Sequence, residues 1–225
     1  MKKLSIALIG GAAISFASLA QAADLPYGSA PASGYDYPPS FTWTGFYAGL
    51  NTGVGFGSFN GNGQAYFGSN PAGWLLGATV GYNYQSGNLL LGGEADWDWS
   101  RIASDASVAP GVASTGIIQD VATVRARFGY VMDRILLFGT GGYAGADVRG
   151  VLNNVPAKAV ADQSYWANGW TLGLGAEYAI TPHITAKAEY LYASFGSNNY
   201  FNSTPNYMSA GANLNMLRAG VNYKF

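Results

Sequence analysis

The feature that most constrains the fold is an alternation of apolar and polar residues that recurs in eight segments of roughly ten residues each. In the segment 89–99, one face carries Trp97 and Trp99. The opposite face carries three acids, which are Glu94, Asp96 and Asp98. Because successive side chains of a β-strand point to opposite faces of a sheet, the alternation predicts an all-β protein whose strands have two unlike faces.

The connections between these segments alternate in length. The predicted strands are 45–56, 74–84, 89–99, 120–130, 135–148, 169–180, 184–195 and 215–225. Short turns lie near 85–88, 131–134 and 181–183, and long links lie near 57–73, 100–118, 149–168 and 196–213. Outer-membrane barrels combine short periplasmic turns with long extracellular loops. We therefore predict an eight-stranded antiparallel up-and-down transmembrane β-barrel; only the facing of 135–148 stays open, because apolar residues occupy both of its faces.

Composition decides which face meets lipid. Charged residues make up 10% of the chain, compared with about 25% in soluble domains. Aromatic residues gather at the strand ends, as in the girdles of membrane barrels. The predicted periplasmic girdle is Tyr82, Tyr84, Tyr130, Tyr178, Tyr223 and Phe225, and the predicted outer girdle is Trp74, Trp97, Trp99, Trp170 and Tyr192. A soluble barrel is the alternative, but so many aromatic side chains exposed on a soluble surface would cause aggregation.

The start of the chain has a different character from the predicted barrel. Residues 1–22 combine two lysines, an apolar stretch and the motif Ala20-Gln21-Ala22, which is typical of a cleaved signal peptide. Residues 23–40 are rich in proline and glycine and predict an extended periplasmic tail. The barrel is expected to occupy residues 41–225. Beyond residue 22, no apolar run reaches the roughly 20 residues of a spanning helix.

The polar faces of the predicted strands collect ten charged residues in the lumen. The acids are Glu94, Asp96, Asp98, Glu177 and Glu189, and the bases are Arg125, Arg127, Lys187, Arg218 and Lys224. An unpaired buried charge is costly, so the equal numbers predict an ion-pair network. Because an eight-stranded barrel is just wide enough for its own side chains, the network is interpreted as a structural plug. A narrow porin-like channel for small solutes or ions, in which some pairs rearrange, is the alternative.

Other chemistries are not indicated by the sequence. A net charge of -1 gives no reason to expect a nucleic-acid partner, and the lack of cysteine removes thiolate chemistry. The sole histidine, His183, falls in a predicted periplasmic turn, whereas Asp96 and Asp98 approach the other rim, so no acid–base dyad is expected. We predict that the protein is not an enzyme and has no catalytic residues and no cofactor.

The three acids of segment 89–99 are the candidate metal ligands of the sequence. Glu94, Asp96 and Asp98 could ligate a hard cation such as Ca²⁺ through oxygen. Arg125 and Arg127 on the neighbouring strand are the more economical partners, since ion pairing already satisfies carboxylates. We therefore expect no metal.

Four stretches resemble the small alphaproteobacterial outer-membrane surface proteins, a porin-family group with OmpA-like barrels. They are FTWTGFYAG at 41–49, VRARFGY at 124–130, LLFGTGG at 136–142 and AKAEYLY at 186–192. The resemblance implies an eight-stranded barrel in the cell outer membrane, a surface-exposed and often immunogenic protein, and a contribution to envelope integrity. It carries no catalytic residues.

The end of the chain is similar to the aromatic signal that the barrel-assembly machinery recognises, with Tyr223 and Phe225 as the signal residues. The expected partners are therefore outer-membrane lipid and, during biogenesis, that machinery. The chain stops at the last predicted strand, so a periplasmic peptidoglycan-binding domain is not expected. The sequence does not indicate which extracellular ligand the loops bind, what the oligomeric state is, or whether particular lipids are preferred.

Overall fold

The computed structural model describes residues 41–61, 70–109, 112–154, 159–200 and 208–225. The predicted signal peptide, 1–22, and the predicted tail, 23–40, lie outside these residues. Among the described residues there is no helix with the length and apolar character needed to cross a bilayer.

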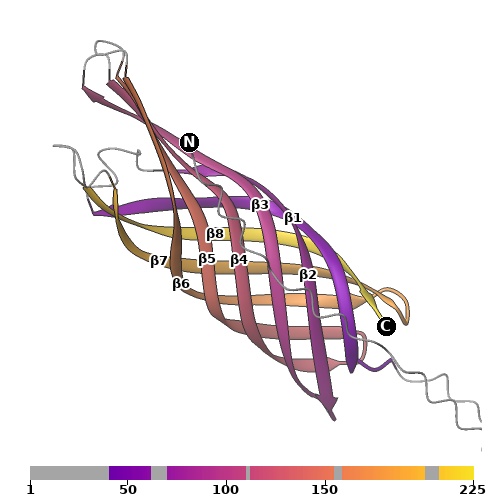
Figure 1. Ribbon diagram of the computed structural model, residues 1–225. Coiled ribbons are helices and arrows are strands. Elements are labelled where there is room, and N and C mark those ends of the chain that lie inside the picture. The colour runs from indigo at the N-terminus through magenta and orange to yellow at the C-terminus, as the bar shows by residue number, and fades with distance from the viewer. Residues whose placement is uncertain (1–40, 62–69, 110–111, 155–158, 201–207) are drawn as a thin grey trace, which may run out of the picture. The chain divides into compact units, whose positions relative to one another are not determined.

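Eight antiparallel strands close into a barrel, in which each strand pairs with its neighbour in sequence and β1 pairs with β8 (Figure 1). The strands are β1 (Gly45–Gly61), β2 (Ala72–Ser86), β3 (Leu89–Ala109), β4 (Val112–Met132), β5 (Ile135–Asn154), β6 (Ala159–Ala179), β7 (Ile184–Tyr200) and β8 (Met208–Lys224). Closure from Tyr47↔Lys224 to Gly61↔Ala210 leaves the first and last strands without a free edge over this length. The predicted eight-stranded antiparallel barrel is confirmed.

The three short turns fall where the sequence predicts them and define what we call the short-turn end. Two of them need a backbone with positive φ: Gly87 has φ of 60° and Asp133 has φ of 54°. Glycine adopts this conformation without steric cost, and aspartate is one of the few other residues that tolerate it. The chain can therefore reverse its direction within two residues at each of these two turns.

Two of the four predicted long links, 100–118 and 149–168, are wrong, and a third, 196–213, is strand over 196–200 and 208–213. Residues 100–118 and 149–168 are largely paired strand: β3 and β4 pair as far as Ala109↔Val112, and β5 and β6 pair as far as Asn154↔Ala159. The strict alternation that reveals a strand is a consequence of having one face in lipid. Where a sheet continues beyond the membrane, backbone pairing persists while the alternation fades, so these segments have the composition of loops.

These continuations form a four-stranded extension of the sheet, made of 104–109, 112–117, 149–154 and 159–166. Pairing of β3 with β2 ends at Ala72↔Ala103, and pairing of β6 with β7 ends at Gly169↔Phe195. Strands β3 to β6 have 20 or 21 residues, about twice the 9–11 that a tilted strand needs to span a membrane. The extension therefore projects beyond the bilayer at the end opposite the short turns.

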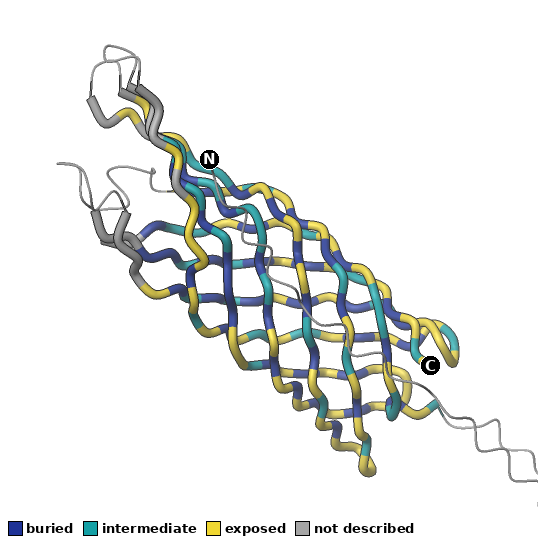
Figure 2. The backbone as a smooth tube through the Cα atoms, viewed as in Figure 1, coloured by how far each residue is buried: buried dark blue, intermediate teal, exposed yellow. Residues whose placement is uncertain are grey.

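Burial alternates along most of the described length of the strands (Figure 2). On β1, Phe46 and Leu50 are exposed to 64% and 68%, whereas Tyr47 and Asn51 are buried. Because the exposed row is the apolar one, the outer surface of this barrel suits lipid rather than water. The aromatic residues predicted for the two girdles are exposed, except that Tyr192 is half-buried against the ring of Trp170.

The facing of β5, which the sequence leaves open, is defined by the structure. Leu136 and Phe138 point into the barrel and are buried, whereas Ile135 and Leu137 lie on the outer surface. Both rows are apolar because the inward one belongs to a second apolar environment inside the lumen.

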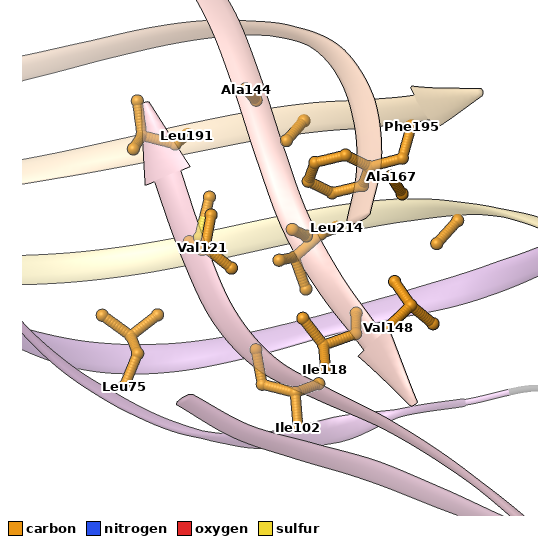
Figure 3. Close-up of a cluster of buried hydrophobic side chains, with 14 of the residues drawn as sticks. Leu75, Ile102, Ile118, Val121, Ala144, Val148, Ala167, Leu191, Phe195 and Leu214 are labelled. Carbon is orange, nitrogen blue, oxygen red and sulfur yellow. The ribbon is translucent and has the colours of Figure 1, made fainter. Parts of the chain in front are cut away.

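The lumen contains three stacked layers rather than one charged interior. The layer nearest the extension is apolar (Figure 3). It contains Phe59, Leu75, Ile102, Ile118, Val121, Ala144, Ala146, Val148, Ala167, Leu191, Ala193, Phe195, Ala212, Leu214 and Met216. A smaller apolar layer lies at the short-turn end and contains Trp43, Leu90, Val131, Leu136, Phe138 and Ala179. The charged residues lie between them, so apolar side chains cover the charged layer on both sides.

Candidate functional site

The charged lumen layer is built by five strands, each contributing inward-facing side chains. It contains Glu94, Asp96 and Asp98 on β3, Arg125 and Arg127 on β4, Glu177 on β6, Lys187 and Glu189 on β7, and Arg218 on β8. All nine are buried, with at most 5% of each residue exposed. Alternate positions on one strand point the same way, which explains why the members occur at spacings of two residues.

Arg125 is the centre of the layer. Its Nη2 donates to Glu94 Oε1 at 2.5 Å and to Asp96 Oδ2 at 2.6 Å, and its Nη1 donates to Glu189 Oε2 at 3.1 Å. Nη1 also donates to the Thr140 hydroxyl at 3.2 Å. The planar guanidinium with its fixed set of donors is suited to serving several carboxylates at once, which an ammonium group does less well.

Arg218 connects the last strand to the third and the seventh. Its Nη1 donates to Asp98 Oδ2 at 2.6 Å. Its Nη2 donates to Glu189 Oε1 at 2.5 Å and lies 3.4 Å from Asp96 Oδ1. Asp96 and Glu189 are therefore shared between Arg125 and Arg218, so the two guanidinium groups and their acids form one connected network.

Arg127 lies nearest the short-turn end and is held by a different set of groups. It forms an ion pair with Glu177, and its Nη1 donates to the Tyr47 hydroxyl at 3.2 Å. Its guanidinium carbon lies 3.8 Å from the centre of the Phe138 ring, which is a cation–π contact of a fully buried arginine. The Tyr47 hydroxyl donates onward to Glu94 Oε2 at 2.8 Å.

Lys187 and several neutral side chains complete the hydrogen bonding. Lys187 Nζ donates to Glu94 Oε2 at 2.9 Å and lies 3.4 Å from Glu189 Oε1. Thr79 and Thr123 donate to the two oxygens of Asp96 at 2.6 and 3.0 Å. Glu177 accepts from Thr185 and from Asn222.

Lys224 does not belong to the network, and its predicted place there is wrong. Its Nζ donates to the backbone oxygen of Thr42 and lies 4.9 Å from the centre of the Phe41 ring. Lys224 is the last residue of β8, where the wall of the barrel ends. The alternation places its side chain on the inward face, but at that height the backbone of the segment before β1 is closer than any carboxylate of the layer.

The layer consequently holds five carboxylates and four basic groups. Asp98 makes one ion pair, to Arg218, and its Oδ1 has no hydrogen-bond partner among the described residues. Asp98 lies directly over Gly77, and a Cβ added at Gly77 would overlap Asp98 Oδ1. Glycine at this inward position of β2 therefore provides the room that the acid side chain fills.

Three carboxylates of the layer, Glu94, Asp96 and Glu189, have oxygens within 4.8 Å of one another. Each of them already accepts from Arg125, and Arg218 or Lys187 adds a second positive charge. Because the protein's own cations occupy the centre of this group, its geometry is that of an ion-pair network. His183 lies in the turn after β6, with Nδ1 2.9 Å from Lys224 O, so it is outside the layer.

Trp43 closes the short-turn end of the lumen, and the sequence reasoning missed it. Its side chain is 1% exposed, although it precedes β1. Its backbone N–H donates to Gln85 Oε1 at 2.8 Å, and its indole N–H donates to Asp133 O at 3.3 Å. Phe41 packs edge-on against it at 4.9 Å. Trp43 lies within the stretch 41–49 that carries the family resemblance, which is the signal that could have pointed to it.

A closed antiparallel barrel with an apolar outer surface, aromatic rims and a charged interior defines a transmembrane β-barrel of the outer-membrane type. Comparison with known proteins agrees with this class. The model of the outer membrane protein beta-barrel domain matches residues 9–225. The chain belongs to this family, and it is located in the outer membrane.

Relatives cover the chain nearly from end to end. The 31 kDa outer-membrane immunogenic protein of Brucella melitensis is 35% identical over 244 residues, covering 100% of both chains. The 22 kDa outer membrane protein of Rhizobium leguminosarum bv. viciae is 33% identical over 192 residues, covering 83% of this chain and 80% of the relative. The expected likeness to small alphaproteobacterial outer-membrane proteins is confirmed.

Among solved structures, the outer membrane protease OmpT from Escherichia coli matches with a TM-score of 0.50. The match has 12% sequence identity and covers 83% of this chain and 98% of that chain. At this identity the likeness concerns the fold alone.

Proposed function

We propose that the protein is a sealed, non-enzymatic structural barrel that stabilises the outer membrane and presents the four-stranded extension at the cell surface. The observation that carries the proposal is the order of layers in the lumen. An ion would have to pass the apolar layer around Leu214, then the ion-paired layer, and then Trp43. Apolar constrictions exclude hydrated ions by dewetting.

The charged layer supports the proposal independently of its apolar covers. The side chains of Arg125, Glu94 and Asp96 have no exposed surface, so the ion pairs fill the cross-section of the barrel. Opening a path between them would separate buried charges, which costs about 3–5 kcal/mol when one partner is lost. Such an interior is suited to holding the wall rigid.

The projecting extension supports a role at the surface. The B. melitensis relative is named an outer-membrane immunogenic protein, a name that fits surface exposure. We propose the same surface exposure for the extension of this chain, which places the short turns in the periplasm. Tyr223 and Phe225 lie at the end of β8 with exposed rings, and we propose that the barrel-assembly machinery recognises them there.

Conductance recording in planar lipid bilayers tests the sealed barrel. The refolded full-length chain is expected to insert without single-channel openings. A double variant, Trp43→Ala with Leu214→Ala, removes one residue from each apolar cover and is expected to stay closed, because the ion pairs of the charged layer still fill the cross-section. Reproducible openings of the unaltered protein that change with Glu94→Gln would contradict the proposal and favour the narrow channel.

A further inference from the structure

A pocket of about 240 Å³ lies at the short-turn end, outside the charged layer. Three basic residues from three elements line it: Arg134 from the turn after β4, His183 from the turn after β6, and Lys224 from the end of β8. Its apolar wall is formed by Phe41, Pro182 and Phe225. None of the nine residues of the charged layer lines it, so it is a separate feature of the molecule.

The two permanent cations of this pocket have no acid partner among the described residues. Arg134 makes one long hydrogen bond, from Nη1 to Ile180 O at 3.4 Å. Lys224 donates to a backbone oxygen and faces an aromatic ring. In the charged layer, by contrast, every cation has at least one carboxylate within 3.1 Å. The pocket therefore presents two basic side chains with unused N–H donors to a ligand.

His183 is held in a fixed orientation beside these cations. Its Nδ1 lies 2.9 Å from Lys224 O, and because a carbonyl oxygen only accepts, Nδ1 carries the hydrogen. Its ring stacks on Tyr223 with centroids 5.7 Å apart. Nε2 is the ring nitrogen left for a ligand, and it donates to an anion when the ring carries its second proton.

The position of the pocket indicates the chemistry of its ligand. Exposed rings of Phe46, Tyr82, Tyr223 and Phe225 surround the short-turn end, and such aromatic belts lie at the level of the lipid headgroups. Guanidinium and ammonium groups together are a common combination for phosphate. The volume is below the roughly 300–1,000 Å³ of most small-molecule sites, so it suits a single headgroup. We propose that Arg134, His183 and Lys224 bind a phosphate group, such as that of an inner-leaflet anionic phospholipid.

The single histidine gives a direct readout of this pocket. The full-length chain is refolded in maltoside micelles, which contain no phosphate, and the ring resonances of His183 are followed by NMR at constant pH. Inorganic phosphate or phosphatidylglycerol is then titrated in. We expect a saturable change of the His183 resonances. Saturation by phosphatidylglycerol at a concentration at least tenfold lower assigns the lipid as the source, and equal behaviour assigns a small phosphate site.

Charge-removing variants distinguish specific binding from a general effect of the added anion. Arg134→Gln combined with Lys224→Gln is expected to raise the half-saturation concentration at least tenfold while the barrel still folds. The matched control is Arg101→Gln, which removes an exposed arginine on β3 near the opposite end and is expected to leave the titration unchanged. No change of the His183 resonances with either anion, or the same titration in the double variant, overturns the proposal.

Discussion

The same kind of ion pair occurs in two very different places in this barrel. Arg218 pairs with Asp98 inside the lumen, where the two side chains are 1% and 0% exposed, and Arg149 pairs with Asp162 on the extension, where they are 38% and 43% exposed. Inside the lumen both side chains are shielded from solvent, so a charge that loses its partner is not stabilised by solvation instead. On the extension, water replaces whichever partner is lost. The distance between the partners therefore does not determine how much each ion pair contributes to stability, whereas its exposure to solvent does.

The largest effect is expected from breaking the buried side of this comparison. Arg218→Met keeps most of the side-chain volume but leaves Asp96, Asp98 and Glu189 without that cation. We expect a loss of about 3–5 kcal/mol in the free energy of unfolding, because uncompensated charges remain in the interior. Urea unfolding of the protein in lipid vesicles measures it. A loss below about 1 kcal/mol would mean that water reaches the layer.

An apolar substitution tests whether the covers of the layer are packed as a protein core is. Leu214→Ala deletes a fully buried side chain from the apolar layer nearest the extension, and a cost of about 3 kcal/mol is expected from lost burial and the cavity left behind. Leu217→Ala is the matched control on the same strand, because Leu217 is 56% exposed and lipid can replace its contacts. Equal losses for the two variants would argue against a packed lumen.

The smallest effect is expected from the exposed pair. Hydrogen bonding from Arg149 lowers the pKa of the Asp162 carboxyl group. A carboxyl with a lowered pKa contributes stability above its unfolded pKa and loses it as the pH falls through the folded value. Arg149→Gln should return the pKa of Asp162 toward its ordinary range, measured by NMR titration, with no detectable change in unfolding. A clear loss of stability would show that the extension is more enclosed than its exposure indicates.

The fold was predictable because lipid imposes a strict pattern on the strands that face it. The alternation around Trp97 and Trp99 located β3, and the acids opposite them led directly to the charged layer. The same dependence on lipid explains the error over 100–118, since a strand outside the membrane has no reason to alternate. The alternation shows which face of a strand contacts lipid, and it does not reveal strand pairing where neither face does.

The site was less predictable because the alternation assigns a residue to the inner or outer face of the barrel but not to a level along the barrel axis. Lys224 and Lys187 both fall on inward positions, yet only Lys187 lies level with the carboxylates. Leu75 likewise falls on the polar face of β2, and only the closed barrel shows that it belongs to an apolar layer. Trp43 precedes the first strand, so no alternation could assign it to the lumen.

The arrangement of the charged layer has a consequence for the order in which the barrel is completed. Asp98 on β3 and Glu189 on β7 are both joined to Arg218, which β8 supplies near the end of the chain. Tyr47 on β1 meets Glu94 on β3. A chain that has not yet closed its seam between β1 and β8 holds acids whose counter-charge has not arrived. Arg125, Arg127 and Lys187 already pair with the other acids, so closure of the seam completes the network by bringing Asp98 its only ion-pair partner among the described residues.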